Sequence, residues 1–175
     1  MQGLIDAYEA IRDFLDLGGP VLRVIAWVIL IMWILILERL IFFRTGLQKQ
    51  IKQSFAVWEA RSERKSWHAH QIREGMISQV RLAANQSLPM IQTLVALCPL
   101  LGLLGTVTGM IQVFQVMAVS GTGNARSMAA GVSMATIPTM AGMVGALSGV
   151  FLVTILTRAA KRRIGFLEDE MTMDH

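Results

Sequence analysis

Two long stretches without a charged side chain restrict the fold of this sequence more than any other feature. Between residues 82 and 157 the single charged residue is Arg126, which separates two uncharged runs (82–125 and 127–157). Each run exceeds the ~20 residues that an α-helix needs to cross the hydrocarbon core of a membrane. A third apolar stretch, VLRVIAWVILIMWILILERLIFF (21–43), comes earlier. The sequence therefore predicts an all-α membrane protein with three transmembrane helices.

The charges predict the orientation of these helices. Residues 44–88 hold eight Lys or Arg against three acids, and the C-terminal tail opens with Arg158, Lys161, Arg162 and Arg163. Basic segments stay in the cytoplasm, so the acidic N-terminus and the turn 118–127 are expected outside. The net charge of +4 thus reflects topology, and no nucleic-acid binding is expected. Four acids among the first twenty residues also argue against a cleavable signal peptide.

The chain is expected to divide into seven segments. The uncharged run 127–157 would measure about 46 Å as a helix, more than the ~30 Å core. The second and third helices are therefore expected to be long and to extend into a cytoplasmic helical bundle. In chain order we expect an outer-face amphipathic helix (1–19), the first span (20–43), a cytoplasmic helical region (44–88), the second span (89–117), a periplasmic turn (118–127), the third span (128–157) and a cytoplasmic C-terminal helix or tail (158–175).

Six glycines recur with the same spacing in the second and third spans. They stand at i, i+3 and i+7 in each helix, as Gly102, Gly105 and Gly109 and then as Gly142, Gly145 and Gly149. Within lipid, small residues let helix backbones approach closely. The glycines therefore predict helix packing, either in a tight antiparallel hairpin or between subunits.

Polar side chains accompany the glycines. They are Thr106, Thr108, Gln112 and Gln115 in the second span and Ser133, Thr136 and Thr139 in the third. A threonine hydroxyl can bond to a carbonyl of its own helix, so a single one needs no partner. Seven polar groups on adjacent helices favour a shared polar surface, which is either a helix–helix contact or a water-accessible lumen. Pro138 frees a backbone carbonyl midway along the third span.

No carboxylate lies between Arg81 and the C-terminal tail. Proton relays inside membranes usually require an ionisable group. If protons cross at the second and third spans, the titrating group must therefore come from another polypeptide, with the hydroxyls as its hydrogen-bond partners.

Two charged residues, Glu38 and Arg39, lie near the end of the first span. Only residues 24–37 of that span are free of charge, about 21 Å of helix, so the span must continue past both. Both side chains can extend to the cytoplasmic interface as anchors. Alternatively, one of them pairs with another subunit, and the sequence favours neither interpretation.

Groups that commonly carry out chemistry are sparse. The single cysteine, Cys98, lies in a span and is expected to pack as a small apolar residue. His68 and His70 lie in a polar stretch without further ligands nearby. No nucleophile–base pair, metal-ligand cluster or phosphate loop is present, so we expect no catalytic residues, no enzyme activity, no cofactor and no metal.

The segments PLLGLLGTVTGMIQVF (99–114) and AAGVSMATIPTMAGMVGAL (129–147) together resemble the paired signature of the ExbB/TolQ/MotA proton-channel superfamily. The predicted three-span topology, the ILERLIFF end of the first span and the basic cytoplasmic segment also resemble ExbB. The resemblance covers about residues 21–165. The small size and short outer N-terminus are similar to the compact ExbB subunits of accessory TonB systems.

This resemblance implies a role in the bacterial inner membrane. Members form a homo-oligomer, a pentamer, whose second and third spans surround a central pore that holds the single membrane helices of an ExbD dimer. An ExbD aspartate carries the proton, and proton flow energises TonB for the outer-membrane uptake of iron chelates. The pore threonines of the family fall on Thr106 and Thr139, while Thr108, Ser133 and Thr136 are further candidates for pore or packing contacts.

One position departs from the family pattern. Many ExbB and TolQ proteins carry a glutamate early in the third span, and that position is Met134 here. A role that belongs to this glutamate is therefore not transferred. Two alternatives to an ExbB-like subunit stay open, namely a TolQ-like or other stator of the family, and a non-conducting membrane scaffold.

Overall fold

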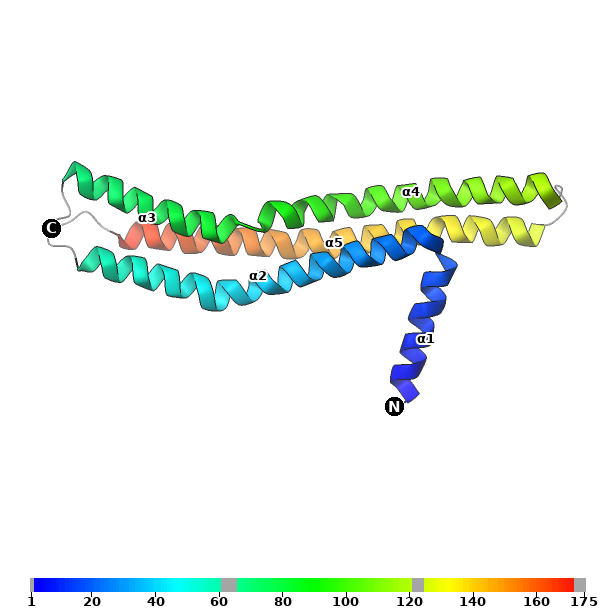
Figure 1. Cartoon of the computed structure of the whole chain (residues 1–175), viewed down its shortest axis with the longest axis horizontal. Coiled ribbons are helices and arrows are strands. Elements are labelled where there is room, and N and C mark those ends of the chain that lie inside the picture. The colour runs from blue at the N-terminus through cyan, green and yellow to red at the C-terminus, as the bar shows by residue number, and fades with distance from the viewer. Residues whose placement is uncertain (1, 61–65, 121–124, 172–175) are drawn as a thin grey trace. The chain divides into compact units, whose positions relative to one another are not determined.

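The computed structural model describes residues 2–60, 66–120 and 125–171, and the regular structure of these ranges is entirely helical. The helices are α1 (Gln2–Leu17), α2 (Gly19–Glu59), α3 (Trp67–Asn85), α4 (Leu88–Ser120) and α5 (Ala125–Glu170) (Figure 1). Three segments of the described chain are long and apolar enough to cross a membrane, Gly19–Glu59, Trp67–Val119 and Met128–Glu170. The predicted all-α fold with three membrane-spanning helices is confirmed.

The helices are longer than a membrane crossing requires. α4 has 33 residues and α5 has 46, which correspond to about 50 and 69 Å of helix. α2 has 41 residues and runs without a break to Glu59, so the boundary expected at residues 43–44 lies inside one helix. α3 begins after Ser66, whose side chain accepts a hydrogen bond from the backbone N–H of Ala69 (3.3 Å). Part of the expected turn (121–124) and the end of the tail (172–175) lie outside the described residues.

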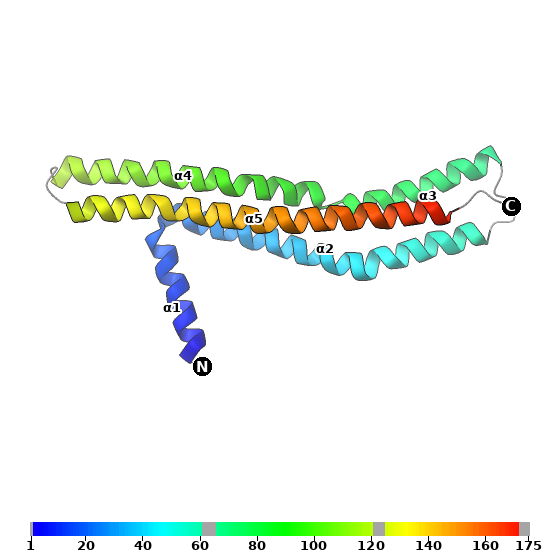
Figure 2. The same ribbon diagram turned by 180° about the vertical axis from the view of Figure 1, so that it is seen from behind.

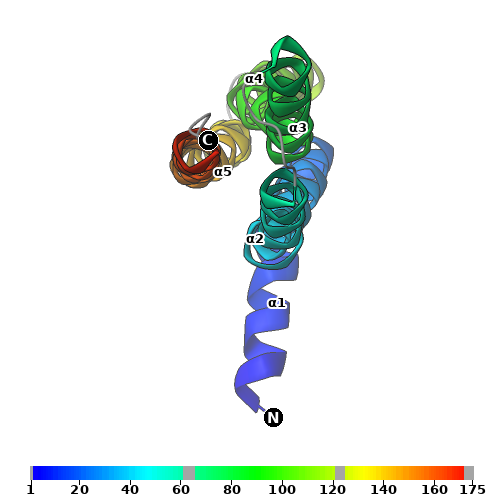
Figure 3. The same cartoon turned by 90° about the vertical axis from the view of Figure 1, so that its left-hand side faces the viewer.

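A glycine in the left-handed region separates α1 from α2. Gly19 has φ +68°, which a residue with a Cβ atom rarely adopts, and Pro20 follows in the first turn of α2. The chain changes direction here, and the N-terminal end of α1 points away from α4 and α5 (Figure 3).

The chain divides into two compact units, and unit 1 comprises residues 1–33 and 93–150. In this unit α4 and α5 run antiparallel side by side, as the two opposite views show (Figures 1 and 2). The start of α2 contributes Leu22, Ile25 and Met32 to the core, and all three are buried. Unit 1 therefore contains both segments that carry the glycines and hydroxyls.

Unit 2 comprises residues 34–92 and 151–175, within which α3 is joined to the end of α5. The guanidinium of Arg73 donates from Nε to the carbonyl oxygen of Met171 (2.7 Å) and from Nη2 to that of Glu168 (2.6 Å). Arg81 donates to the Glu168 carboxylate (2.6 Å). Because the last carbonyls of a helix have no partner within it, Arg73 caps α5.

Candidate functional site

The two helices with the sequence signature pack backbone to backbone in unit 1. A methyl group added at Gly142 of α5 would lie 2.5 Å from the carbonyl oxygen of Cys98 in α4. One added at Gly109 of α4 would lie 2.5 Å from the Cβ atom of Ala135 in α5. No side chain fits at either position, so the close approach of the two helices depends on glycine.

The glycines of α5 face more than one neighbour. A methyl group at Gly145 would meet Ile29 of α2, and one at Gly149 would meet both Met32 of α2 and Val95 of α4. The hairpin expected from the sequence therefore has α2 packed against it. The apolar residues of α2 gave no signal for this contact, because a helix that is apolar on every side shows no preferred face.

The four threonine hydroxyls of the candidate site donate hydrogen bonds to backbone carbonyls. Thr139 donates to Gly102 of the neighbouring helix (2.9 Å). The other three bond within their own helices, Thr106 to Leu103 (2.7 Å), Thr136 to Ser133 (3.0 Å) and Thr108 to Gly105 and Leu104 (both 3.0 Å). The protons of these four hydroxyls are thus engaged within the chain, and the oxygen lone pairs are left as hydrogen-bond acceptors.

The contacts of α4 with α5 fix the level of these groups along the helix pair. Gly102 lies against Thr139, and Gly105 lies against Pro138. Thr106 follows Gly102 by four residues, so Thr106 and Thr139 lie about one helical turn apart along the pair, about 6 Å. Both are half-buried, whereas Ser133 and Thr136 are exposed. Thr106 and Thr139, the two threonines predicted to line the pore, therefore lie at similar heights along the helix pair.

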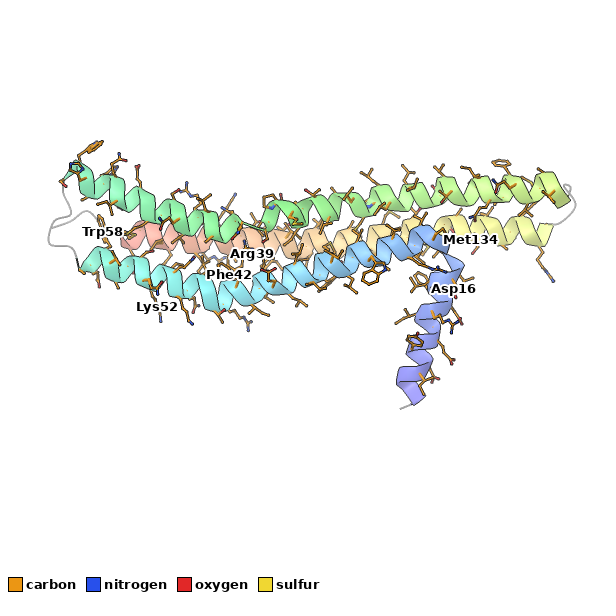
Figure 4. The ribbon with its side chains drawn as sticks, viewed as in Figure 1. Asp16, Arg39, Phe42, Lys52, Trp58 and Met134 are labelled. Atoms are coloured by element: carbon orange, nitrogen blue, oxygen red, sulfur yellow. The ribbon has the colours of Figure 1, made fainter. Side chains whose placement is uncertain are left out.

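A cleft beside Met134 brings carboxylates of α1 to α5. Asp13, Asp16, Ser133 and Met134 line this cleft, which has a volume of about 560 Å³ (Figure 4). Pro138 is buried in α5 and has no N–H, so the carbonyl of Met134 loses its helical donor. The sequence gave no indication that α1 would contribute carboxylates next to the third span, since more than a hundred residues separate them.

Arg39 is a buried charge within unit 2. Its side chain is 3% exposed, and its Nε and Nη2 atoms have no hydrogen-bond partner among the described residues. Its guanidinium lies 5.0 Å from the ring centre of Phe42 (Figure 4). Glu38 is exposed. Arg39 therefore differs from an anchoring side chain, which keeps its charged group in water. Ile36 and Phe43, at i−3 and i+4 from Arg39, are also buried, so Arg39 lies on the buried face of α2.

The polar groups outside these sites have local partners. His70 lies 3.2 Å from Glu74, and His68 stacks edge-on against Trp67. Cys98 is buried and donates to the carbonyl oxygen of Leu94 (3.3 Å). Within the described ranges, no three His, Cys, Asp or Glu side chains gather as metal ligands would. Apart from Arg126 near the start of α5 and the thiol of Cys98, the polar side chains of α4 and α5 in the described part of unit 1 are thus hydroxyls and amides.

Comparison with known proteins places this geometry in a family. Residues 38–169 match the MotA/TolQ/ExbB proton channel family, and this match includes all of α4 and nearly all of α5. The chain belongs to this family. As a MotA/TolQ/ExbB member with three apolar helices, it is a multi-pass membrane protein of a proton-channel family.

Two relatives in Synechocystis sp. carry names that describe ExbB-like proteins of biopolymer transport. ExbB-like 1 is 36% identical over 80 residues, which are 44% of this chain and 32% of the relative. ExbB-like 3 is 30% identical over 81 residues, which are 45% of this chain and 39% of the relative. The chain thus matches about a third of the length of these relatives. The likeness is to the ExbB branch of the MotA/TolQ/ExbB family.

Proposed function

We propose that this MotA/TolQ/ExbB member is an ExbB-like proton-channel and stator subunit of a bacterial inner membrane. With an ExbD-type partner it converts the proton motive force into work on TonB, and so drives outer-membrane uptake of iron chelates and similar substrates. Family membership and the ExbB-like relatives support this function. Thr106 and Thr139 line the proton path.

One observation carries the proposal. The hydroxyl protons of Thr106 and Thr139 are engaged by backbone carbonyls, which leaves their oxygens as acceptors. An acceptor suits a protonated carboxylic acid, which donates one hydrogen bond, better than a carboxylate, which only accepts. The hydroxyls therefore stabilise the neutral form of an acid that a partner helix carries through the membrane. This matches the lack of carboxylates in the apolar parts of α4 and α5.

The proposed assembly is a homo-oligomer, a pentamer, with α4 and α5 around a central pore that holds an ExbD dimer. Thr136 is an exposed residue of α5 whose hydroxyl bonds to its own helix, so its oxygen can accept a further hydrogen bond from a group in the pore. We also place the N-terminus in the periplasm and the C-terminus in the cytoplasm, because the basic residues collect at residues 44–88 and 158–163.

A non-conducting scaffold is the second candidate, and one contact favours it. The Thr139 hydroxyl joins α5 to α4, so it also has a packing role that needs no proton. The two functions predict different results for a variant that loses the acceptor oxygen but keeps the fold. A proton channel would lose activity, whereas a scaffold would not.

The test is energy-dependent uptake in cells that co-express the chain with an ExbD-type partner and TonB. We expect Thr106→Val and Thr139→Val to reduce uptake strongly, and Thr106→Ser and Thr139→Ser to retain it. Thr157→Val is the matched control, because Thr157 bonds to the carbonyl of Val153 in the same way but lies in unit 2. Wild-type uptake in the double valine variant, at an unchanged amount of protein in the membrane, would remove both threonines from the mechanism and favour the scaffold.

A further inference from the structure

An apolar groove in unit 1 is not accounted for by the proposed proton path. It has a volume of about 610 Å³ and lies where α1, α2 and α5 meet, lined among others by Phe14, Ile29, Trp33, Ile137, Met140 and Val144. The one hydroxyl in its wall, that of Ser148, donates to the carbonyl of Gly145 (2.8 Å). The groove therefore offers no free hydroxyl proton to a ligand. Its volume lies within the ~300–1,000 Å³ typical of ligand sites.

The groove is shorter than a membrane-spanning helix. Its wall on α5 runs from Ile137 to Ser148, about 17 Å along the helix. A neighbouring membrane-spanning helix would need a contact surface along the whole ~30 Å hydrocarbon core. The dimensions thus favour a lipid acyl chain over a second copy of the chain.

Charged groups gather at one end of this groove. The cleft with Asp13 and Asp16 adjoins it along α5, because Ser133 and Met134 precede Ile137 by one turn. Arg23 of α2 forms an ion pair with Asp16 (3.1 Å), and both side chains are more than half exposed. This end of the groove therefore presents two carboxylates and a guanidinium.

We propose that this composite site binds a zwitterionic phospholipid with a primary amine headgroup, of the phosphatidylethanolamine type. One acyl chain lies in the apolar groove. The headgroup ammonium donates hydrogen bonds to Asp13 and Asp16, and Arg23 donates to the phosphate. A primary ammonium has three donors for the two carboxylates, whereas a choline headgroup has none and a glycerol headgroup has no positive charge.

The bound lipid also fixes α1. The residues of α1 that line the cleft with α5 lie in its last turns, while its N-terminal end points away (Figure 3). A lipid held between α1, α2 and α5 adds apolar contact to all three. The inference requires only that the chain spans a membrane, so it stands or fails independently of the proposed work on TonB.

Native mass spectrometry of the purified full-length chain tests the site. The protein is supplied in separate samples with phosphatidylethanolamine, phosphatidylcholine and phosphatidylglycerol. We expect the first to be retained most strongly. The double variant Asp13→Asn/Asp16→Asn is expected to bind phosphatidylethanolamine about tenfold more weakly, because charge-assisted hydrogen bonds are lost. Asp6→Asn is the control, since Asp6 is exposed on α1 and does not line the cleft.

A second pair of variants tests the groove itself. Val144→Trp enlarges a side chain in the wall of the groove, whereas Leu147→Trp adds the same side chain at a similarly exposed position of α5 that does not line it. We expect Val144→Trp to abolish lipid retention and Leu147→Trp to leave it unchanged. Because Asp13 and Asp16 are exposed, the asparagine variant tests the headgroup even if Val144→Trp disturbs folding.

Three results would overturn the proposal. One is equal retention of the three lipids by the wild type. Another is equal lipid retention by Val144→Trp and Leu147→Trp. The third is a loss of subunits from the oligomer in Val144→Trp without a change in bound lipid, which would assign the groove to a helix of a second copy.

Discussion

The hydroxyl of Thr139 donates a hydrogen bond to the carbonyl oxygen of Gly102, 37 residues earlier in the chain, over a distance of 2.9 Å. The same two residues form part of the close approach of α5 to α4, because a methyl group added at Gly102 would lie 3.0 Å from the Cα atom of Thr139. One threonine of the signature therefore holds the helix pair together and presents its oxygen as an acceptor.

Removal of the Thr139 hydroxyl is expected to destabilise this helix pair. Thr139→Val keeps the shape of the side chain but loses the hydrogen bond, and such bonds between membrane helices contribute about 0.6 kcal/mol on average. Thr139→Ser retains the donor and is expected to stay near the wild type. The thermal midpoint of the purified chain measures both. A valine variant as stable as the serine variant would mean that the bond contributes nothing to packing.

Gly142 is expected to tolerate no side chain. Gly142→Ala would place a methyl group 2.5 Å from the Cys98 carbonyl oxygen, and since backbone cannot move aside easily, we expect a loss of about 1–3 kcal/mol. Gly165→Ala is the matched control in the same helix, because nothing lies within 4 Å of the added group. For Gly165→Ala we expect the free energy of unfolding to rise by up to about 1 kcal/mol, because alanine has a higher helix propensity than glycine. Equal thermal midpoints for the two variants would contradict the close packing of α4 and α5.

The helical fold follows from the sequence because its causes are local. Uncharged runs such as 127–157 identify membrane helices by length alone. The left-handed Gly19 begins α2, at the residue where the amphipathic segment was expected to end. α2 continues to Glu59, past the residue where the first span was expected to pass into a cytoplasmic helical region. The composition changes there from apolar to basic, but no proline interrupts the helix.

The contacts of the candidate site could not be predicted from the sequence, because they depend on how distant segments pack together. The pattern identified Thr139 as polar within lipid but could not name Gly102 as the acceptor of its hydrogen bond. The cleft of Asp13 and Asp16 with Met134 arises only after α1 folds against α5. Neither contact has a periodic signal, because each joins single residues across a tertiary interface.

The cap that Arg73 places on α5 is expected to stabilise the last turn of that helix. Arg73→Ala removes two hydrogen bonds to carbonyls, at Glu168 and Met171, and we expect faster amide hydrogen exchange in the last turn of α5. Arg81→Ala removes one contact between more exposed side chains, which contributes at most about 1 kcal/mol and is screened by salt. Equal exchange rates in both variants at high salt would rule out a backbone cap by Arg73.

The buried guanidinium of Arg39 is expected to lower the stability of the isolated chain. Contact with the Phe42 ring stabilises the fold by about 0.5–2 kcal/mol. Burial of an unpaired charge destabilises it by several kcal/mol. We therefore expect Arg39→Met to raise the thermal midpoint of the monomeric chain in detergent, and Arg44→Met, at an exposed position of the same helix, to leave it unchanged. A lower midpoint for Arg39→Met would reveal a stabilising partner for the guanidinium.

The lack of space between α4 and α5 has a mechanical consequence. Two helices whose backbones touch at glycines cannot slide or roll past each other without collision of Gly142 with Cys98 or of Gly109 with Ala135. The pair must therefore tilt or shift as one rigid element. For the proposed stator function, this predicts that relative motion is confined to surfaces outside this pair, with the hairpin as a fixed wall.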